Sequence, residues 1–405
     1  MNLRSDSPYW LLHTPVLYTY NALQQDIETE IAVIGGGISG ALVAHKLVSE
    51  GHHVTLVTAG HIADGSTCAS TSLLQYEIDV PLYKLIKKTG YKRAVESYLL
   101  CHGSIDKLEV LHKKLGLSKN FQKRKSLLLA STKKDVDALK MEYESRLKIG
   151  IDVSWLSQNK LKKEFGLRSP AAVYSAKGGQ TDAYLFTQTL VKRCADSGAS
   201  VFDKTETEKI TSNRQGVKLT TSTGYTIKAR YAVMATGYET VNWINKNFTQ
   251  LHSTYVIISE PVKKEYLWKD ECLIWETATP YVYIRTTPDH RIIIGGKDEP
   301  FNSAHKRDSL LNIKSKQLLQ TFQKKFPNIP FNIEYKWAGT FAETRDGLPF
   351  IGSIKEFPNV FFALGFGGNG ITFSQIAADL ISDKIAGRPN PDLRLFSFSR
   401  MVNQT

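Results

Sequence analysis

The chain has 405 residues, of which 42% are hydrophobic and 22% are charged, and its formal net charge at pH 7 is +13. This length exceeds one ordinary hydrophobic core and predicts two domains, while the composition excludes a disordered or fibrous protein. The N-terminus has no signal-peptide pattern, and no apolar run approaches the roughly 20 residues needed to cross a bilayer. We expect a cytoplasmic protein with no transmembrane segment.

The four cysteines, Cys68, Cys101, Cys194 and Cys272, lie far apart and form no CxxC pair. This spacing predicts neither a disulfide framework nor a zinc site, and we expect no metal. Such cysteines fit a reducing compartment.

The stretch "IAVIGGGISGALVAHKLVSEGHHVTLVTAG" at residues 31–60 is typical of a strand, a glycine turn, a helix and a second strand. Gly35, Gly37 and Gly40 form a GxGxxG pattern. The first glycine permits a tight turn, the second lets the backbone approach a pyrophosphate, and the third lets the helix pack on the strand. Free N–H groups at the helix start favour phosphates, so we expect a dinucleotide here.

A Ser/Thr-rich loop and then a basic segment follow. Between Lys84 and Glu164 there are 20 Lys and Arg against 9 Asp and Glu. Apolar residues at three- and four-residue spacing predict amphipathic helices up to about residue 165 with basic solvent faces. We interpret these faces as solvated surface, with attraction of an anionic substrate or a membrane surface as the alternative. No nucleic-acid motif accompanies the charge, so we expect no nucleic acid as a partner.

The middle of the chain is predicted to be rich in strands. Residues 216–237, "GVKLTTSTGYTIKARYAVMATG", predict a hairpin that turns at Thr223 and Gly224 and ends in a buried strand. Residues 251–300 contain further strands with a turn at Pro288, and residues 304–325 are predicted to be helical.

A second glycine motif, "GFGGNGITFS", lies near the C-terminus. Gly365, Gly367, Gly368 and Gly370 precede a helix predicted to start near Thr372, so backbone N–H groups can face a ligand. A flat heteroaromatic ring with developing negative charge suits such a helix end. We expect one site assembled from both ends of the chain.

These motifs resemble those of the FAD-dependent amino-acid and amine oxidases, which include D-amino-acid oxidase, glycine oxidase, sarcosine oxidase and gamma-glutamylputrescine oxidase. The tail "DGLPFIG…GFGGNGITFS…GRPNP" carries the most specific part of the resemblance. It implies an α/β fold in which a Rossmann-like FAD-binding domain, discontinuous in sequence, joins an antiparallel-sheet substrate domain. We assign the FAD-binding domain to residues 1–85, 170–240 and 336–405, and the substrate domain with the basic helices to residues 86–169 and 241–335.

The resemblance also implies which residues contact FAD. Around the pyrophosphate it places Gly35, Gly37, Ile38, Ser39 and Gly40. Beside the flavin it places Thr67, Ser70, Thr71 and Leu73. Thr207 meets the adenine, and Gly237 follows the strand under the ADP half. At the flavin pyrimidine edge, where the helix dipole favours negative charge, it places Gly367, Asn369, Gly370, Ile371 and Thr372.

The sequence departs from the family at both ends of this site. Thr58 stands where relatives have an acidic ribose ligand, with His61 at the basic position that follows, so we expect a weaker contact to the ribose. Phe341 stands where amino-acid-oxidising relatives have an arginine that grips the substrate carboxylate, which a phenyl ring cannot do. Simple D-amino acids and glycine are therefore disfavoured, unless Arg285 or Arg345 substitutes.

Two further departures concern the flavin. No cysteine follows Cys272, and Cys68 and Ala69 stand where other relatives carry a flavin-linked histidine, so we expect non-covalent FAD. Ile293 stands where sarcosine oxidases have a lysine that favours oxygen, so a quinone or carrier competes with oxygen as electron acceptor.

The sequence and the resemblance together predict oxidation of a C–N bond in a small amine or amino acid, by hydride transfer to flavin followed by hydrolysis of the imine. Such chemistry requires positioning and exclusion of water more than an acid or base. The catalytic candidates are Tyr255, Tyr283, Arg285 and Phe341, with Trp337 nearby. The alternatives are a flavin dehydrogenase or 2-hydroxy-acid oxidase, an FAD-carrying subunit of a larger dehydrogenase, and a nicotinamide-dependent reductase.

Overall fold

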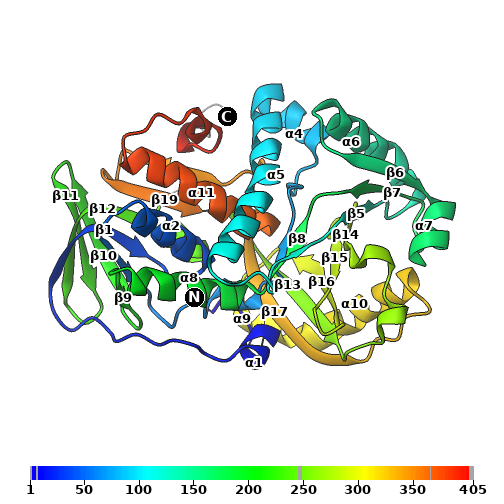
Figure 1. Ribbon diagram of the computed structural model, residues 1–405, viewed down its shortest axis with the longest axis horizontal. Coiled ribbons are helices and arrows are strands. Elements are labelled where there is room, and N and C mark those ends of the chain that lie inside the picture. The colour runs from blue at the N-terminus through cyan, green and yellow to red at the C-terminus, as the bar shows by residue number, and fades with distance from the viewer. Residues whose placement is uncertain (1, 6–7, 245–248, 365, 401–405) are drawn as a thin grey trace.

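The computed structural model describes residues 2–5, 8–244, 249–364 and 366–400. Two eight-stranded sheets form the centres of two lobes that lie side by side (Figure 1). The long helix α5 (Tyr91–Lys114) lies between the lobes in the same view.

The first sheet is parallel at its centre and antiparallel at its margins. β1 pairs in parallel with β2 and β12, and β2 and β12 continue the parallel part to β9 and β19. Its inner strands read as continuous apolar runs because both faces are covered. In spatial order the strands are β10 (Thr207–Asn213), β11 (Gly216–Thr221), β12 (Thr226–Met234), β1 (Ile27–Ile34), β2 (Val54–Val57) and β9 (Ser200–Phe202), with β19 (Val360–Leu364) beside β12 and β18 (Phe350–Ser353) beside β19.

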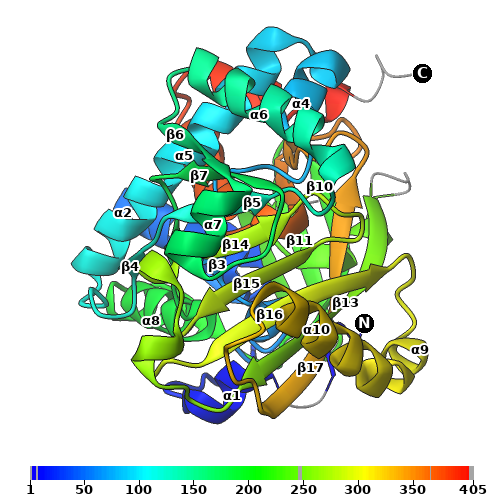
Figure 2. The ribbon, with the colours of Figure 1, turned by 90° about the vertical axis from the view of Figure 1, so that its right-hand side faces the viewer.

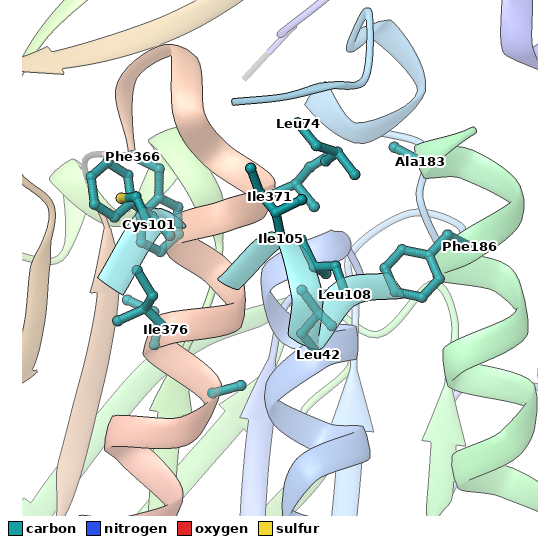
Figure 3. Close-up of a cluster of buried hydrophobic side chains, with 14 of the residues drawn as sticks. Leu42, Leu74, Cys101, Ile105, Leu108, Ala183, Phe186, Phe366, Ile371 and Ile376 are labelled. Atoms are coloured by element: carbon teal, nitrogen blue, oxygen red, sulfur yellow. The ribbon is translucent and has the colours of Figure 1, made fainter. Parts of the chain in front are cut away.

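Three helices cover the first sheet: α2 (Ile38–Ser49), α8 (Ala183–Asp196) and α11 (Gly370–Ile385). α2 packs between α8 and α11, and α5 packs on α11. Figure 3 shows the apolar side chains that these helices share, which include Leu42, Ile105, Phe186 and Ile376. The same cluster contains Ile371, so the packing of the helices also fixes the start of α11.

The second sheet is largely antiparallel, with one parallel pair between β14 and β5. The helix α10 (Leu311–Lys325) lies across its outer face (Figure 2), where Leu318 and Phe322 pack on Ile257 and Ile284. In spatial order the strands are β17 (Ile333–Thr344), β13 (Thr249–Ser259), β16 (Ile292–Glu299), β15 (Val282–Thr286), β14 (Leu273–Glu276), β5 (Ser126–Leu129), β7 (Ala171–Ser175) and β6 (Val153–Ser157).

The remaining elements are short or peripheral. A small sheet contains β3 (Leu73–Leu74), β8 (Gly179–Gln180) and β4 (Gln122–Lys123). The other helices are α1 (Tyr9–His13), α3 (Ser66–Ala69), α4 (Leu82–Thr89), α6 (Val136–Lys148), α7 (Gln158–Phe165) and α9 (Ala304–Ser309). The 3-10 turns are η1 (Lys133–Asp135), η2 (Gly237–Asn242), η3 (Lys264–Tyr266), η4 (Lys269–Glu271), η5 (Gly367–Asn369) and η6 (Pro391–Leu395).

The predicted α/β fold, with a mixed parallel sheet and a largely antiparallel sheet, is confirmed. The expectation that residues up to about 165 are helices alone is wrong, because β5 and β6 lie there and pair with β7. β5 is a four-residue run with every residue buried, too short for a helix.

The assigned domain ranges do not follow the two sheets everywhere. β7 and most of β17 fall in ranges assigned to the FAD-binding domain, yet they belong to the second sheet. Conversely, α5 falls in a range assigned to the substrate domain and packs on α11. The boundaries themselves stay a prediction.

Most of the predicted basic face is exposed, as at Lys160, Lys162 and Lys163 of α7. Arg146 is the opposite case, since it is fully buried between Glu77 and Glu142. Within the described part of the chain, no helix has the length and apolarity that crossing a membrane requires.

Candidate active site

A cavity of about 1300 Å³ lies where the two sheets meet. Its lining begins near Thr58 at the end of β2, passes the start of α2 and reaches Tyr283 on β15. Gly35 of the first motif and Gly370 of the second both line it. Both ends of the chain therefore line one cavity, while Gly365 lies outside the described residues.

The glycines of the first motif allow backbone to pack on backbone. A Cβ atom on Gly40 would lie 1.8 Å from the Gly35 carbonyl oxygen, and one on Gly35 would lie 2.3 Å from the Ala235 oxygen. Gly40 does not line the cavity but lets α2 approach β1, whereas Gly37 caps α2 and does line it. The first turn of α2 has no acidic residue, so its N–H groups can face an anion.

Ile38 and Ser39 follow at the start of α2 and also line the cavity. The Ile38 N–H donates to Thr67 Oγ1 at 3.0 Å, and the Ser39 and Ser374 hydroxyls lie 2.7 Å apart, which links α2 to α11. The start of α2 is thus held by two contacts, one with Thr67 and one with Ser374 of α11.

The end of the cavity near β2 holds Thr58, His61 and Thr207. Thr207 Oγ1 is buried and has no hydrogen-bond partner, so this end has a polar atom available for a ligand. His61 Nδ1 lies 3.2 Å from Asp203 Oδ2, which holds the imidazole against the protein. Gly237 lines the cavity next to the end of β12.

We predict that Thr58→Glu tightens FAD binding about five- to tenfold, because a carboxylate makes a stronger, charge-assisted hydrogen bond to a ribose than a hydroxyl does. Titration of the apoprotein with FAD measures this change. Ser222→Glu, on an exposed turn, is the control and leaves the affinity unchanged. Unchanged or weaker binding by Thr58→Glu contradicts the assignment of this position.

The segment from Thr67 to Leu73 forms the middle of the lining, and Ser70 and Thr71 lie within it. Buried donors hold its backbone. Trp337 Nε1 donates to the Ala69 oxygen at 2.8 Å, and Trp10 Nε1 donates to the Ser70 oxygen at 2.7 Å. Trp337 therefore positions this segment and does not itself line the cavity.

The second glycine motif forms the turn before α11, where Gly367, Asn369, Gly370 and Ile371 line the cavity. Asn369 Nδ2 donates to the carbonyl oxygens of Gln75 and Glu77 at 3.1 and 2.7 Å, which anchors the turn. Thr372 is buried and does not line the cavity.

Aromatic rings and carboxyl groups form the wall at the second sheet. The wall contains Asp79, Trp275, Tyr281, Tyr283 and Asp298. Trp275 and Tyr283 are paired across β14 and β15, so their side chains share a face. A Cβ atom on Gly295 would lie 2.4 Å from the Tyr283 ring, so this glycine makes room for that ring.

The carboxyl groups at this wall hold their protons unusually tightly. Burial, reinforced by the neighbouring carboxyls of Glu343 and Asp79, raises the pKa of Asp298 to about 7. Burial also raises the pKa of Asp79 to about 6 and the pKa of Glu343 above its ordinary value.

This shift predicts a stability that falls as the pH rises. Folded protein keeps the Asp298 proton up to about pH 7, whereas the unfolded chain releases it near 3.8, so the free energy of unfolding declines across that window. Thr254 and Lys314 oppose the shift only in part. Asp298→Asn should reduce the loss of stability between pH 5 and pH 8 by about 2 kcal/mol, measured by chemical denaturation. If the free energy of unfolding of Asp298→Asn depends on pH as steeply as that of the wild type, this expectation is contradicted.

Two of the predicted catalytic residues, Tyr283 and Phe341, line the cavity, and Phe341 stacks on His252 with ring centroids 5.4 Å apart. Their roles stay predictions.

Tyr255 does not line the cavity, and this prediction is corrected. Successive side chains of β13 point to opposite faces, so Thr254 faces the cavity and Tyr255 packs under α10. Lys314 Nζ lies 5.5 Å from the centre of its ring.

Arg285 is likewise removed from the catalytic set. It lies two residues beyond Tyr283 on the same face, past the end of the cavity. Its Nη1 donates to the carbonyl oxygens of Ser72 and Thr181, both at 3.0 Å. Arg345 is exposed and does not line the cavity.

Four lining residues were not predicted from the sequence: Asp79, Asp298, Trp275 and Tyr281. The available signal for Asp298 was its place after Gly295 and Gly296, a glycine pair at the end of a predicted strand. Asp79 lies in a loop about 220 residues away in sequence, so no local pattern joins the two.

A parallel nucleotide-binding sheet joined to an antiparallel sheet across a long cavity, with a glycine turn at two helix starts, defines a flavin-dependent oxidoreductase. The chain belongs to the DAO family, described as FAD dependent oxidoreductase, whose sequence model matches residues 30–384. It is an FAD-dependent oxidoreductase of this family.

Individual relatives match the chain over nearly its whole length. Glycine oxidase of Geobacillus kaustophilus strain HTA426 is 26% identical, over 93% of this chain and 98% of that protein. A protein of Bacillus subtilis strain 168 named as a Rieske 2Fe-2S iron-sulfur protein, YhfW, is 24% identical, over 97% of this chain and 75% of that protein. The solved L-proline dehydrogenase from P. horikoshii has the same fold, with a TM-score of 0.76, 22% identity, and coverage of 94% of this chain and 99% of that one.

Proposed function

We propose that the protein oxidises a C–N bond of an amine or amino acid, using non-covalently bound FAD. The observation that carries the proposal is the aromatic wall of Trp275, Tyr281 and Tyr283, which faces the same cavity as the glycine turn before α11. A substrate between them lies beside the predicted flavin edge and is shielded from water.

The residues of the cavity fit FAD. The start of α2, with no acidic residue in its first turn, would hold the pyrophosphate, and the unpaired Thr207 hydroxyl lies at the end proposed for the adenosine. The turn from Gly367 to Ile371 would hold the flavin pyrimidine edge, where the N-terminus of α11 favours negative charge. When bound, FAD accepts a hydride from the substrate carbon.

The protein's own residues orient the substrate and exclude water. The amine enters as the free base, its Cα–H bond breaks with both electrons, and a C=N bond forms as the nitrogen gives its proton to solvent. Water then hydrolyses the imine to a carbonyl compound and ammonia, or to a carbonyl compound and an amine where the nitrogen carries a second carbon group. No acid or base is required at the carbon.

The environment of Cys68 supports non-covalent FAD. This thiol does not line the cavity, its Sγ donates to the Gly65 oxygen at 3.1 Å, and burial raises its pKa to about 12. A protonated buried thiol is a poor nucleophile. Acid precipitation should therefore leave the yellow cofactor in the supernatant. All four cysteines are unpaired, which also supports a reducing compartment such as the cytoplasm.

The electron acceptor is oxygen or a carrier. Ile293, at the position proposed for an oxygen-activating lysine, is fully buried and does not line the cavity, which supports a carrier. Aerobic incubation with a panel of amines, N-methyl compounds, amino acids and 2-hydroxy acids tests the proposal. Carbonyl product and released amine are expected from the nitrogen compounds. Turnover of 2-hydroxy acids alone overturns the proposal, and the yield of peroxide reports the acceptor.

A further inference from the structure

Charge is unevenly distributed along the cavity wall. Among the lining residues that the structure describes, Arg4 and His61 are the basic side chains. Arg4 forms an ion pair with Asp64 at 2.6 Å, and His61 contacts Asp203 at the ribose end. The described wall at the second sheet therefore presents carboxyl groups and no cation.

The two carboxyl groups of this wall are held in place. Asp79 accepts a hydrogen bond from the Gly368 N–H at 2.8 Å and one from the Tyr281 hydroxyl at 3.4 Å. Asp298 lies at the end of β16, and its Oδ1 is buried without a hydrogen-bond partner. A buried, unpaired carboxylate oxygen that lines a substrate cavity points to a missing donor.

Aromatic rings line the same cavity as these carboxyl groups. The ring centroids of Trp275 and Tyr281 are 6.4 Å apart, and those of Tyr281 and Tyr283 are 6.0 Å apart. Electron-rich ring faces next to carboxylates form the usual recognition site for an organic ammonium group. Phe341 adds another ring to the lining of the cavity.

We propose that the substrate is a carboxylate-free diamine or polyamine, whose second, charged nitrogen is bound by Asp298 and Asp79 inside the cage of Trp275, Tyr281 and Tyr283. This inference rests on the proposed function and specifies its substrate class. A substrate carboxylate would add another negative charge to a wall that already contains two carboxyl groups, with Glu343 behind them.

The electrostatics of the wall agree with this assignment. The raised pKa values of Asp79, Asp298 and Glu343 reflect carboxyl groups that are partly removed from water and lack sufficient positive charge nearby. The nearby His252, 3.6 Å from Glu343, has its own pKa lowered by burial and so supplies little charge. A bound ammonium group supplies the charge that the wall lacks.

The test compares three ligands that each contain four carbons and one amino end: butylamine, 1,4-diaminobutane and 4-aminobutanoate. The holoenzyme is mixed anaerobically with each ligand, and the loss of flavin absorbance is followed against concentration. The quantity compared is the limiting rate of flavin reduction divided by the half-saturating ligand concentration. We expect this ratio to be at least about tenfold higher for the diamine than for butylamine, and to be lowest for 4-aminobutanoate. An order with 4-aminobutanoate first, or the absence of any preference for the diamine, overturns the inference.

Variants on one strand separate the proposed site from general effects. Asp298→Asn should raise the half-saturating concentration of the diamine about tenfold. It should change the half-saturating concentration of butylamine less than about threefold. Glu299→Gln is the matched control, since Glu299 pairs with Lys314 of α10 and does not line the cavity. An equal effect of Asp298→Asn on both ligands contradicts the inference.

A ligand that binds but cannot be oxidised distinguishes the proposed cation site from the proposed oxidation of a C–N bond. Tetramethylammonium has no free electron pair on nitrogen, so it can occupy the cage and perturb the flavin spectrum without reacting. We expect it to bind to the wild type and about tenfold more weakly to Asp298→Asn. If no amine reduces the flavin but tetramethylammonium binds in this way, the oxidation proposal fails and the cation site stands. If amino acids reduce the flavin and tetramethylammonium does not bind, the inference fails and C–N oxidation stands.

Discussion

Gly40→Ala is expected to yield protein without FAD. The new Cβ atom would lie 1.8 Å from the Gly35 carbonyl oxygen, far inside contact distance, and the opposing atom is backbone that cannot rotate away. The start of α2 must then move off β1, which removes the N–H groups proposed to hold the pyrophosphate. We expect FAD affinity to fall by about 100-fold or more and stability to fall by about 1–3 kcal/mol. The FAD-to-protein ratio after gel filtration measures the first effect.

Gly65→Ala is the matched control for Gly40→Ala. Gly65 lines the same cavity, has φ −83°, and has open space around its Cβ position. It should keep a full complement of FAD. Normal FAD content in Gly40→Ala would show that the cofactor does not depend on the approach of α2 to β1.

The second large effect is expected for Arg285→Met. The guanidinium donates to the buried carbonyl oxygens of Ser72, Thr181 and Thr286, and methionine removes these three hydrogen bonds. The Ser72 oxygen has a further donor, the Thr181 N–H. We expect a loss of about 3–5 kcal/mol in the free energy of unfolding. Because Arg285 lies outside the cavity, the folded fraction should keep its substrate half-saturation within about threefold.

Chemical denaturation and steady-state kinetics at low temperature separate the two possible roles of Arg285. Arg345→Met, at an exposed arginine, is the control and should change neither quantity. A large rise in half-saturation with unchanged stability would instead restore Arg285 as a substrate-binding residue.

The cofactor half of the site could be read from sequence because its geometry is local. Gly35, Gly37 and Gly40 act within one strand-turn-helix unit, and the C-terminal glycine turn acts within a few residues of the start of α11. Steric requirements of this kind leave a fixed spacing in the chain. The turns at Gly224 and Pro288 could be predicted for the same reason.

The substrate half could not be read in this way because it depends on the face and register of strands. Tyr255 and Tyr283 look equivalent in sequence, and the pairing of β13 with β16 and β17 decides that Tyr255 turns away from the cavity. The Arg285 side chain points to the same face of β15 as Tyr283 but lies beyond the end of the cavity. Asp79 and Asp298 line one cavity although they lie far apart in sequence, Asp79 in the segment before α4 and Asp298 on β16 of the second sheet.

Anaerobic mixing of purified holoenzyme with 1,4-diaminobutane is the decisive experiment on C–N oxidation. We expect the visible flavin absorbance to be lost in a single turnover and one equivalent of aminoaldehyde to form per flavin. The contradicting result is a flavin that stays oxidised with this diamine and with every other amine and amino acid tried, while dithionite still reduces it.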